Sequence, residues 1–196
     1  MRLFRPLGLK ELELIISTGN QSFPPRLDWQ PIFYPVLNYE YAAQIAQRWN
    51  TVDEFSGYVG FITEFEVEDS FIEKYEVKNV GGKIHNEYWI PAEELAAMNE
   101  AIVGEIQITG SYYGPKYQGV VSETSLFAGQ NAVEQAEIIA KNPDGIIQSI
   151  KTEKAIMLAN LSFWELRSLT LAIVKDSWKE SFPTLSLQRS ESIINK

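Results

Sequence analysis

Three residues of this chain are the first candidates for a catalytic or ligand-binding role: Arg5, His85 and Glu87. An arginine carries a planar fork of N–H donors that can pair two oxygens of one ligand at once. His85 and Glu87 are two positions apart, and residues so spaced face the same way on a strand. Each residue also has a structural interpretation: Arg5 as a surface ion-pair partner, Glu87 as a solvated strand residue and His85 as a satisfied structural histidine.

Aromatic side chains are concentrated in two neighbouring segments, residues 32–34 and 39–42. Tyr34 and Tyr41 are the candidates for stacking on a flat ligand ring, and both could instead be core aromatics whose hydroxyls reach the surface. Trp49 and Trp89 are expected in the core.

Strands and helices that alternate along the first 110 residues would position these side chains. Arg5 ends an opening strand at residues 3–5 that Pro6 closes, and a helix follows from residue 9 to a stop at Gly19. Alternation and β-branched or aromatic content predict further strands, and apolar residues at helical spacing predict further helices. The expected strands are 31–34, 58–67, 77–80, 85–90 and 102–109, and the expected helices are 39–49 and 92–99.

The later part of the chain has a different character. Residues 112–119 are rich in Tyr, Gly and Pro, which predicts a loop. Helices are expected at 132–141, 145–160 and 163–178. The fold class expected from the whole pattern is α+β, with a module at residues 1–110 and a loop and helical extension at residues 111–196.

Composition excludes several kinds of site. The chain has no cysteine and a single histidine, which removes thiol nucleophiles, zinc–thiolate sites and iron–sulfur clusters and disfavours a multi-histidine metal site. We therefore expect no metal.

The acidic charge is unevenly distributed. The formal net charge is -9, and residues 1–110 hold eight Lys or Arg against seventeen Asp or Glu, whereas the rest of the chain is neutral. An acidic chain disfavours nucleic acid as a partner. No signal peptide and no run of about 18 apolar residues is visible, so we expect no membrane span and a cytoplasmic location.

Three ordered motifs resemble those of ADP-ribosyltransferase-fold proteins. The first is the opening strand with Arg5, followed by Glu-Leu-Glu-Leu-Ile-Ile at residues 11–16. The second is a strand followed by a helix that starts Glu-Tyr-Ala at residues 40–42. The third is the strand at residues 86–91 followed by a short helix. The resemblance covers about residues 2–110 and extends to bacterial proteins that carry an ADP-ribosylation or crystallin-J1 label.

The resemblance implies a split-sheet module that holds NAD as a substrate. Arg5 would steady the phosphate or ribose portion of NAD, and Tyr34 or Tyr41 would stack on the nicotinamide. Glu87 would accept a hydrogen bond from a ribose hydroxyl and favour the oxocarbenium-like state as nicotinamide leaves. His85 would stand where the family often places a residue that helps to choose the acceptor.

Three functions follow from these observations. The first is transfer of ADP-ribose from NAD to an unknown acceptor. The alternative is a catalytically inactive module of the same fold that binds a protein partner or self-associates, with the C-terminal helices as a possible contact for a homo-oligomer. The third is a toxin-like effector built on the same chemistry.

Overall fold

The computed structural model describes residues 1–120, 127–141, 153–167 and 192–194 of the chain. The fold class is α+β, as the sequence predicts. The strands are β1 (Arg2–Leu7), β2 (Ile32–Phe33), β3 (Val59–Val67), β4 (Lys78–Asn79), β5 (Asn86–Glu87), β6 (Ile90–Pro91), β7 (Ile102–Tyr113) and β8 (Ser192–Ile194). The α-helices are α1 (Leu9–Ser17), α2 (Tyr39–Arg48), α3 (Asp69–Ile72), α4 (Leu95–Glu100), α5 (Ala132–Lys141) and α7 (Lys154–Leu166).

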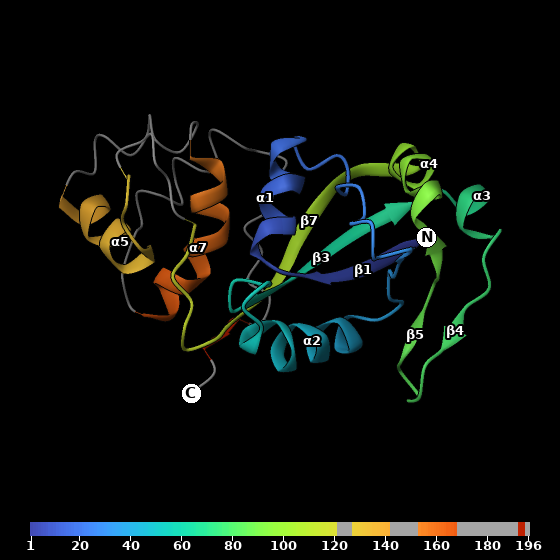
Figure 1. Ribbon diagram of the computed structural model, residues 1–196, viewed down its shortest axis with the longest axis horizontal. Coiled ribbons are helices and arrows are strands. Elements are labelled where there is room, and N and C mark those ends of the chain that lie inside the picture. Colours follow the sequence, from blue (N-terminus) through green and yellow to red (C-terminus); the bar gives the residue numbers. More distant parts are fainter. Residues whose placement is uncertain (121–126, 142–152, 168–191, 195–196) are drawn as a thin grey trace.

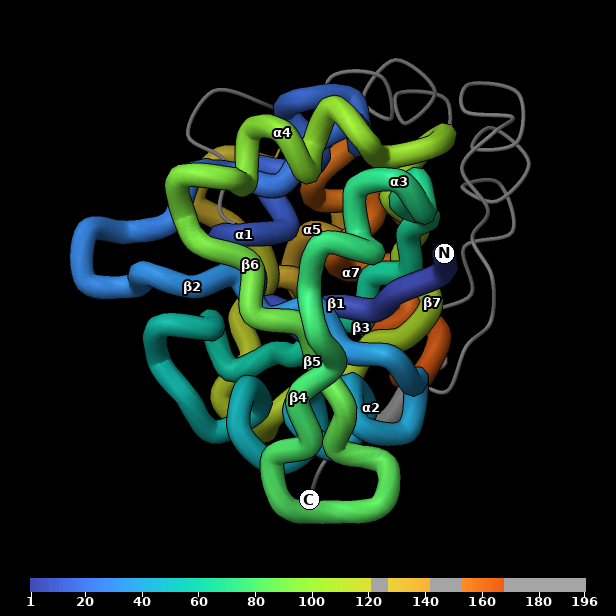
Figure 2. The backbone as a smooth tube through the Cα atoms, turned by 90° about the vertical axis from the view of Figure 1, so that its right-hand side faces the viewer, coloured from blue at the N-terminus to red at the C-terminus, as the bar shows by residue number. Residues whose placement is uncertain are grey.

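A four-stranded sheet in the order β1-β3-β7-β8 forms the centre of the fold. Its first three strands are antiparallel neighbours, and β8 runs parallel to β7. Two small antiparallel pairs, β2-β6 and β4-β5, accompany it. Val36 forms bridges to Phe4 on one side and to Glu87 on the other, so it links the edge strand β1 to β5. The β4-β5 hairpin is thereby attached to the edge of the main sheet (Figure 2).

Helices α1 and α2 cover opposite faces of this sheet (Figure 1). On the α2 face, Ala42 and Ala46 pack with Phe4 and Ile62 in one buried cluster. The approach of α2 depends on Gly60, because a Cβ atom there would lie within 3.0 Å of the Ala46 backbone. The α1 face holds the larger core, to which Leu3 and Leu12 contribute among many others.

Helices α5 and α7 lie at the end of the molecule beyond α1 (Figure 1). The indole Nε1 of Trp164 donates to the Ala132 carbonyl, and the hydroxyl of Tyr113 donates to the Ala159 carbonyl at 2.8 Å. Residues of α7, among them Ile156 and Trp164, belong to the same buried cluster as residues of β1 and α1. The core is therefore continuous across residue 110.

Several expected elements differ from the observed ones. Strand β7 continues past the expected end at Thr109 to Tyr113, because β3 pairs with it as far as Val59 opposite Tyr113. The strand expected at 85–90 is two short strands, β5 and β6, which pair with different partners. Helix α7 runs through residues 161–162, where a break was expected. The rest of the two helices expected at 145–160 and 163–178 lies outside the described residues.

The expectations for the end of α1 and for the bounds of α5 are confirmed. Helix α1 ends beside Gly19, which has a φ of 71°, and α5 has the expected bounds. Within the described residues, no helix is long and apolar enough to cross a membrane.

Candidate functional site

The Glu87 carboxylate is nearly buried and is held by two side chains. The Tyr41 hydroxyl donates to Oε2 at 3.3 Å, and the Trp89 indole Nε1 donates to Oε1 at 2.7 Å. Glu87 is only 8% exposed. A carboxylate offers about four lone-pair sites, so two acceptor positions are left for a ligand. We call Glu87, Tyr41, His85 and Trp89 the Glu87 cluster.

The backbone fixes the position of Glu87. Strand β5 is anchored on both sides, by β4 and by the bridge to Val36, and the Tyr88 amide donates to the Pro35 carbonyl. Glu87 and Trp89 are two positions apart, so their side chains meet on one face. Tyr41 comes from the first turn of α2. Asn38 is the N-cap residue of α2 and makes no side-chain capping hydrogen bond.

His85 packs between an aromatic ring and a glycine. Its imidazole stacks on Tyr41 with ring centroids 4.4 Å apart and an interplanar angle of 25°. Its Nε2 lies 3.0 Å from Oε1 of Gln44, a contact that fits an N–H donor at Nε2. A Cβ at Gly82 would come within 3.0 Å of the ring, so only glycine leaves room for it. The ring therefore orients Tyr41, which in turn contacts Glu87.

Burial and the Glu87 charge both raise the pKa of Tyr41 above its ordinary value. Desolvation is the larger cause, because it disfavours the phenolate. The raised pKa extends the pH range over which the hydroxyl stays protonated and donates to Glu87.

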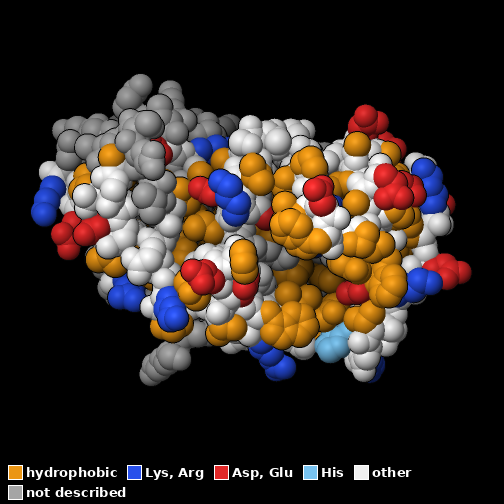
Figure 3. Space-filling model, in the orientation of Figure 1, with side chains coloured by type: hydrophobic (Ala, Val, Ile, Leu, Met, Phe, Trp, Pro, Cys, Tyr) orange, Lys and Arg blue, Asp and Glu red, His pale blue; other side chains and the backbone are white. Residues whose placement is uncertain are grey.

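Exposed aromatic rings border the cluster. Trp89 is 45% exposed and Tyr34 is 38% exposed, and their rings meet edge to face with centroids 6.0 Å apart. Figure 3 shows hydrophobic side chains gathered around a hollow beside the single histidine of the chain. The expectation that Trp89 and Trp49 belong to the core is wrong, since Trp49 is 62% exposed. Trp89 instead contributes a donor and an open ring surface to the cluster.

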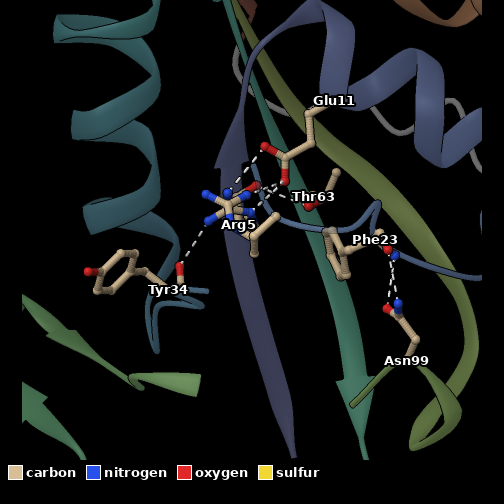
Figure 4. Close-up of polar contacts among 7 residues, drawn as sticks. Arg5, Glu11, Phe23, Tyr34, Thr63 and Asn99 are labelled. Atoms are coloured by element: carbon tan, nitrogen blue, oxygen red, sulfur yellow. Dashed lines mark hydrogen bonds and ion pairs between the residues drawn. The ribbon is translucent and has the colours of Figure 1, made fainter. Parts of the chain in front are cut away.

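Arg5 is buried in an ion pair with Glu11 of α1. Its Nε donates to Oε1 at 2.7 Å and its Nη2 donates to Oε2 at 3.2 Å (Figure 4). Its Nη1 donates to the Tyr34 carbonyl at 3.3 Å, and the guanidinium lies 4.5 Å from the centroid of the Phe33 ring. Arg5 is thus not a surface residue: three of its N–H donors bind Glu11 and the Tyr34 carbonyl, so that it connects β1, α1 and the Tyr34 backbone.

Arg5 and Glu87 lie on opposite faces of the sheet. Val36 pairs directly with Phe4 and with Glu87, and directly paired residues have their side chains on the same face of a sheet. Glu87 contacts Tyr41 of α2, so this is the face that α2 covers. Arg5 follows Phe4 and so points to the α1 face. The structure therefore brings together Glu87, His85 and Tyr41 as the sequence motifs suggest, with Tyr34 at the border, and it separates Arg5 from them.

The sequence pattern did not identify Glu11 or Trp89 as parts of a site. Trp89 had a usable signal, because it is two positions after Glu87 on an expected strand. Within the described residues, no group of three or more His, Asp or Glu is arranged to hold a metal ion.

Comparisons with protein-family models, with curated proteins and with solved structures return no match for this chain. The chemistry of its own residues therefore has to carry the assignment. That chemistry is a fixed, nearly buried carboxylate with two free acceptor positions, next to open aromatic rings. Such an arrangement suits a flat ligand that carries positive charge.

Proposed function

We propose that this protein binds NAD at the Glu87 cluster and transfers ADP-ribose from it to an acceptor, within an ADP-ribosyltransferase-like module of about residues 1–110. The observation that carries the proposal is the Glu87 carboxylate, held by Tyr41 and Trp89 at the edge of an aromatic surface. The nicotinamide ring of NAD is flat and positively charged, and both properties match this surface. The proposal includes a cytoplasmic location, where NAD is available as a substrate.

Glu87 has two tasks in this proposal. One carboxylate oxygen accepts a hydrogen bond from a ribose hydroxyl, which orients the sugar. The negative charge also stabilises the positive charge that develops on the ribose as the bond to the nicotinamide nitrogen breaks. Nicotinamide leaves with the bonding electron pair, and an acceptor nucleophile forms the new bond to the same ribose carbon.

The neighbouring side chains position these groups. One face of the Tyr41 ring is covered by His85, so Tyr34 and Trp89 present the open rings for the nicotinamide. Arg5 enters as a positioning residue, because its hydrogen bond to the Tyr34 carbonyl fixes the backbone beside that ring. His85 contributes through Tyr41.

The test compares the parent chain with Glu87→Gln and with the control Glu66→Gln, an exposed glutamate on β3. Calorimetry with NAD measures binding, and release of labelled nicotinamide measures turnover. Loss of a transition-state contact of this kind commonly lowers the rate by about 100-fold or more. We expect Glu87→Gln to lose turnover and Glu66→Gln to keep it. If the parent neither binds NAD nor releases nicotinamide, the proposal is wrong.

A second candidate is a module of the same fold that binds a protein partner or self-associates without catalysis. Three large apolar side chains favour it, since Trp49, Val52 and Phe55 are 62%, 70% and 95% exposed and lie within seven positions. Hydrogen bonds stabilise the turn that carries these side chains, because Asp53 accepts from both the amide and the hydroxyl of Ser56. Light scattering over a range of protein concentrations tests self-association. A monomer at every concentration, with the same mass for Phe55→Ser, would count against it.

A further inference from the structure

Arg26 is a buried arginine with almost no partner. Its side chain is 9% exposed, and the one ion pair it makes among the described residues is a contact of 3.8 Å between Nη1 and Oε1 of Glu11. Its Nε is buried and has no hydrogen-bond partner in the part of the chain that the structure describes. Buried arginine donors are normally satisfied, because leaving them unpaired is costly.

The carboxylate beside Arg26 is already engaged. Both oxygens of Glu11 accept hydrogen bonds from Arg5, at 2.7 and 3.2 Å. Arg5 and Arg26 together carry two positive charges against one negative charge. Burial, and then the charge of Arg5, lower the pKa of Arg26. An arginine nevertheless stays protonated in a protein, so one buried positive charge is left over in this group.

The guanidinium groups of Arg5 and Arg26 lie near one aromatic ring, and Arg5 keeps N–H donors for a further acceptor. Both guanidinium groups lie near the ring of Phe33, with Cζ at 4.5 Å for Arg5 and 5.9 Å for Arg26 from its centroid. The terminal nitrogens of Arg5 use one N–H each on Glu11 and on the Tyr34 carbonyl, so each keeps a second N–H. Figure 4 shows this end of Arg5 between Glu11 and the Tyr34 backbone.

We propose that Arg26 and Arg5 together bind an oxyanion group, the carboxylate or phosphate of a small ligand, on the α1 face of the sheet. The ligand supplies the missing negative charge, and its paired oxygens accept from the guanidinium fork of Arg26. Glu11 contacts both arginines through its Oε1 atom, at 2.7 Å from Arg5 Nε and 3.8 Å from Arg26 Nη1. This site is separate from the Glu87 cluster and does not depend on the proposed use of NAD.

Thermal unfolding of the full chain tests the site. Inorganic phosphate and acetate are titrated separately in an amine–chloride buffer, with sodium chloride at equal ionic strength as the reference. We expect the anion to raise Tm above the sodium chloride reference, by roughly 3–6 °C when it reaches about ten times its Kd. A rise with phosphate alone identifies a phosphate group as the ligand, and a rise with acetate identifies a carboxylate.

Variants decide whether Arg26 is responsible. Arg26→Gln should abolish the rise in Tm, whereas Arg48→Gln, which changes an exposed arginine at the end of α2, should leave it unchanged. Glu87→Gln should also leave it unchanged, which separates this inference from the NAD proposal. An equal rise in Arg26→Gln and the parent, or no rise in the parent above the sodium chloride reference, would overturn the inference.

A direct measurement covers the case in which Arg26→Gln does not fold. The arginine Nε–H resonances of the parent are followed by NMR during the phosphate and acetate titrations, and the Arg26 signal is assigned by its absence in Arg26→Lys. We expect this resonance to shift along a saturating binding curve as the anion that raises Tm is added. An Arg26 resonance that stays in place while either anion is added would show that no oxyanion binds there.

Discussion

Replacing Glu11 by glutamine tests how much of the fold depends on the arginine pair. The carboxylate of Glu11 lies between the guanidinium groups of Arg5 and Arg26, and the exposed fractions of the three side chains are 20%, 9% and 9%. Glu11→Gln keeps the shape of the side chain and removes its charge. Two guanidinium groups would then face each other in a buried setting with no negative charge between them.

The expected loss of stability follows from this burial. Removing one partner of a buried ion pair destabilises a protein by about 3–5 kcal/mol, because the other charge is left uncompensated. Glu11 retains some exposure, so we expect the lower end, about 3 kcal/mol. For a chain of this size that corresponds to a fall in Tm of roughly 6–12 °C. Urea unfolding followed by circular dichroism measures the free energy directly.

The matched control is Glu13→Gln, on the same helix. Glu13 pairs with Lys10 at 3.4 Å, and Lys10 is 74% exposed. Exposed pairs contribute about 0.2–1 kcal/mol at most, so this variant should unfold close to the parent. If Glu11→Gln and Glu13→Gln lose the same small amount, the buried arginine pair is not held by Glu11 and the reasoning fails.

Two further predictions concern buried polar groups. Burial raises the pKa of Tyr41 and Tyr113, whereas tyrosine in an unfolded chain has a pKa of about 10. Above that pH the native state therefore binds more protons than the unfolded state. The free energy of unfolding, measured in urea between about pH 8 and 11, should therefore be constant at first and fall beyond about pH 10. The fall should be smaller in Tyr113→Phe, and a flat profile for the parent would contradict the argument. Asn160 accepts from the Tyr117 hydroxyl at 2.6 Å and donates to the Gln135 side chain at 2.6 Å. Asn160→Ala should destabilise by about 1–3 kcal/mol for each group left unpaired, and an unchanged urea midpoint would count against that role.

Local patterns in the sequence were enough to predict the helices that cover the sheet. The apolar spacing and the glycine stop predict α1, and α5 has the expected bounds, since both signals act within a few residues. Strand β7 was harder, because its last residues are rich in Tyr and Gly and it is the pairing with β3 that keeps them extended. Residues 85–90 likewise divide between two partners that lie far away in the sequence.

The candidate site was predictable only in part, for the same reason. Glu87 and Tyr41 belong to separate motifs, and their contact depends on the bridge through Val36. The sequence singles out Arg5, but its partner Glu11 lies on a helix whose rotation about its axis the spacing does not define. The face of the sheet on which each side chain lies follows from strand register, and this is where the sequence interpretation of Arg5 departs from the structure.

The burial of Arg5 and Arg26 also changes the meaning of the charge distribution. Residues 1–110 hold only eight positive side chains against seventeen negative ones, and these two arginines are nearly hidden from solvent. The surface that an approaching anion meets is therefore more acidic than the sequence count suggests. Long-range attraction then cannot draw an anionic ligand in, and salt should weaken the repulsion by screening it. Affinity must therefore come from short, directed contacts. For an oxyanion these are the N–H donors of Arg26 on one face of the sheet, and for NAD they are Glu87 and the aromatic rings beside it on the other face.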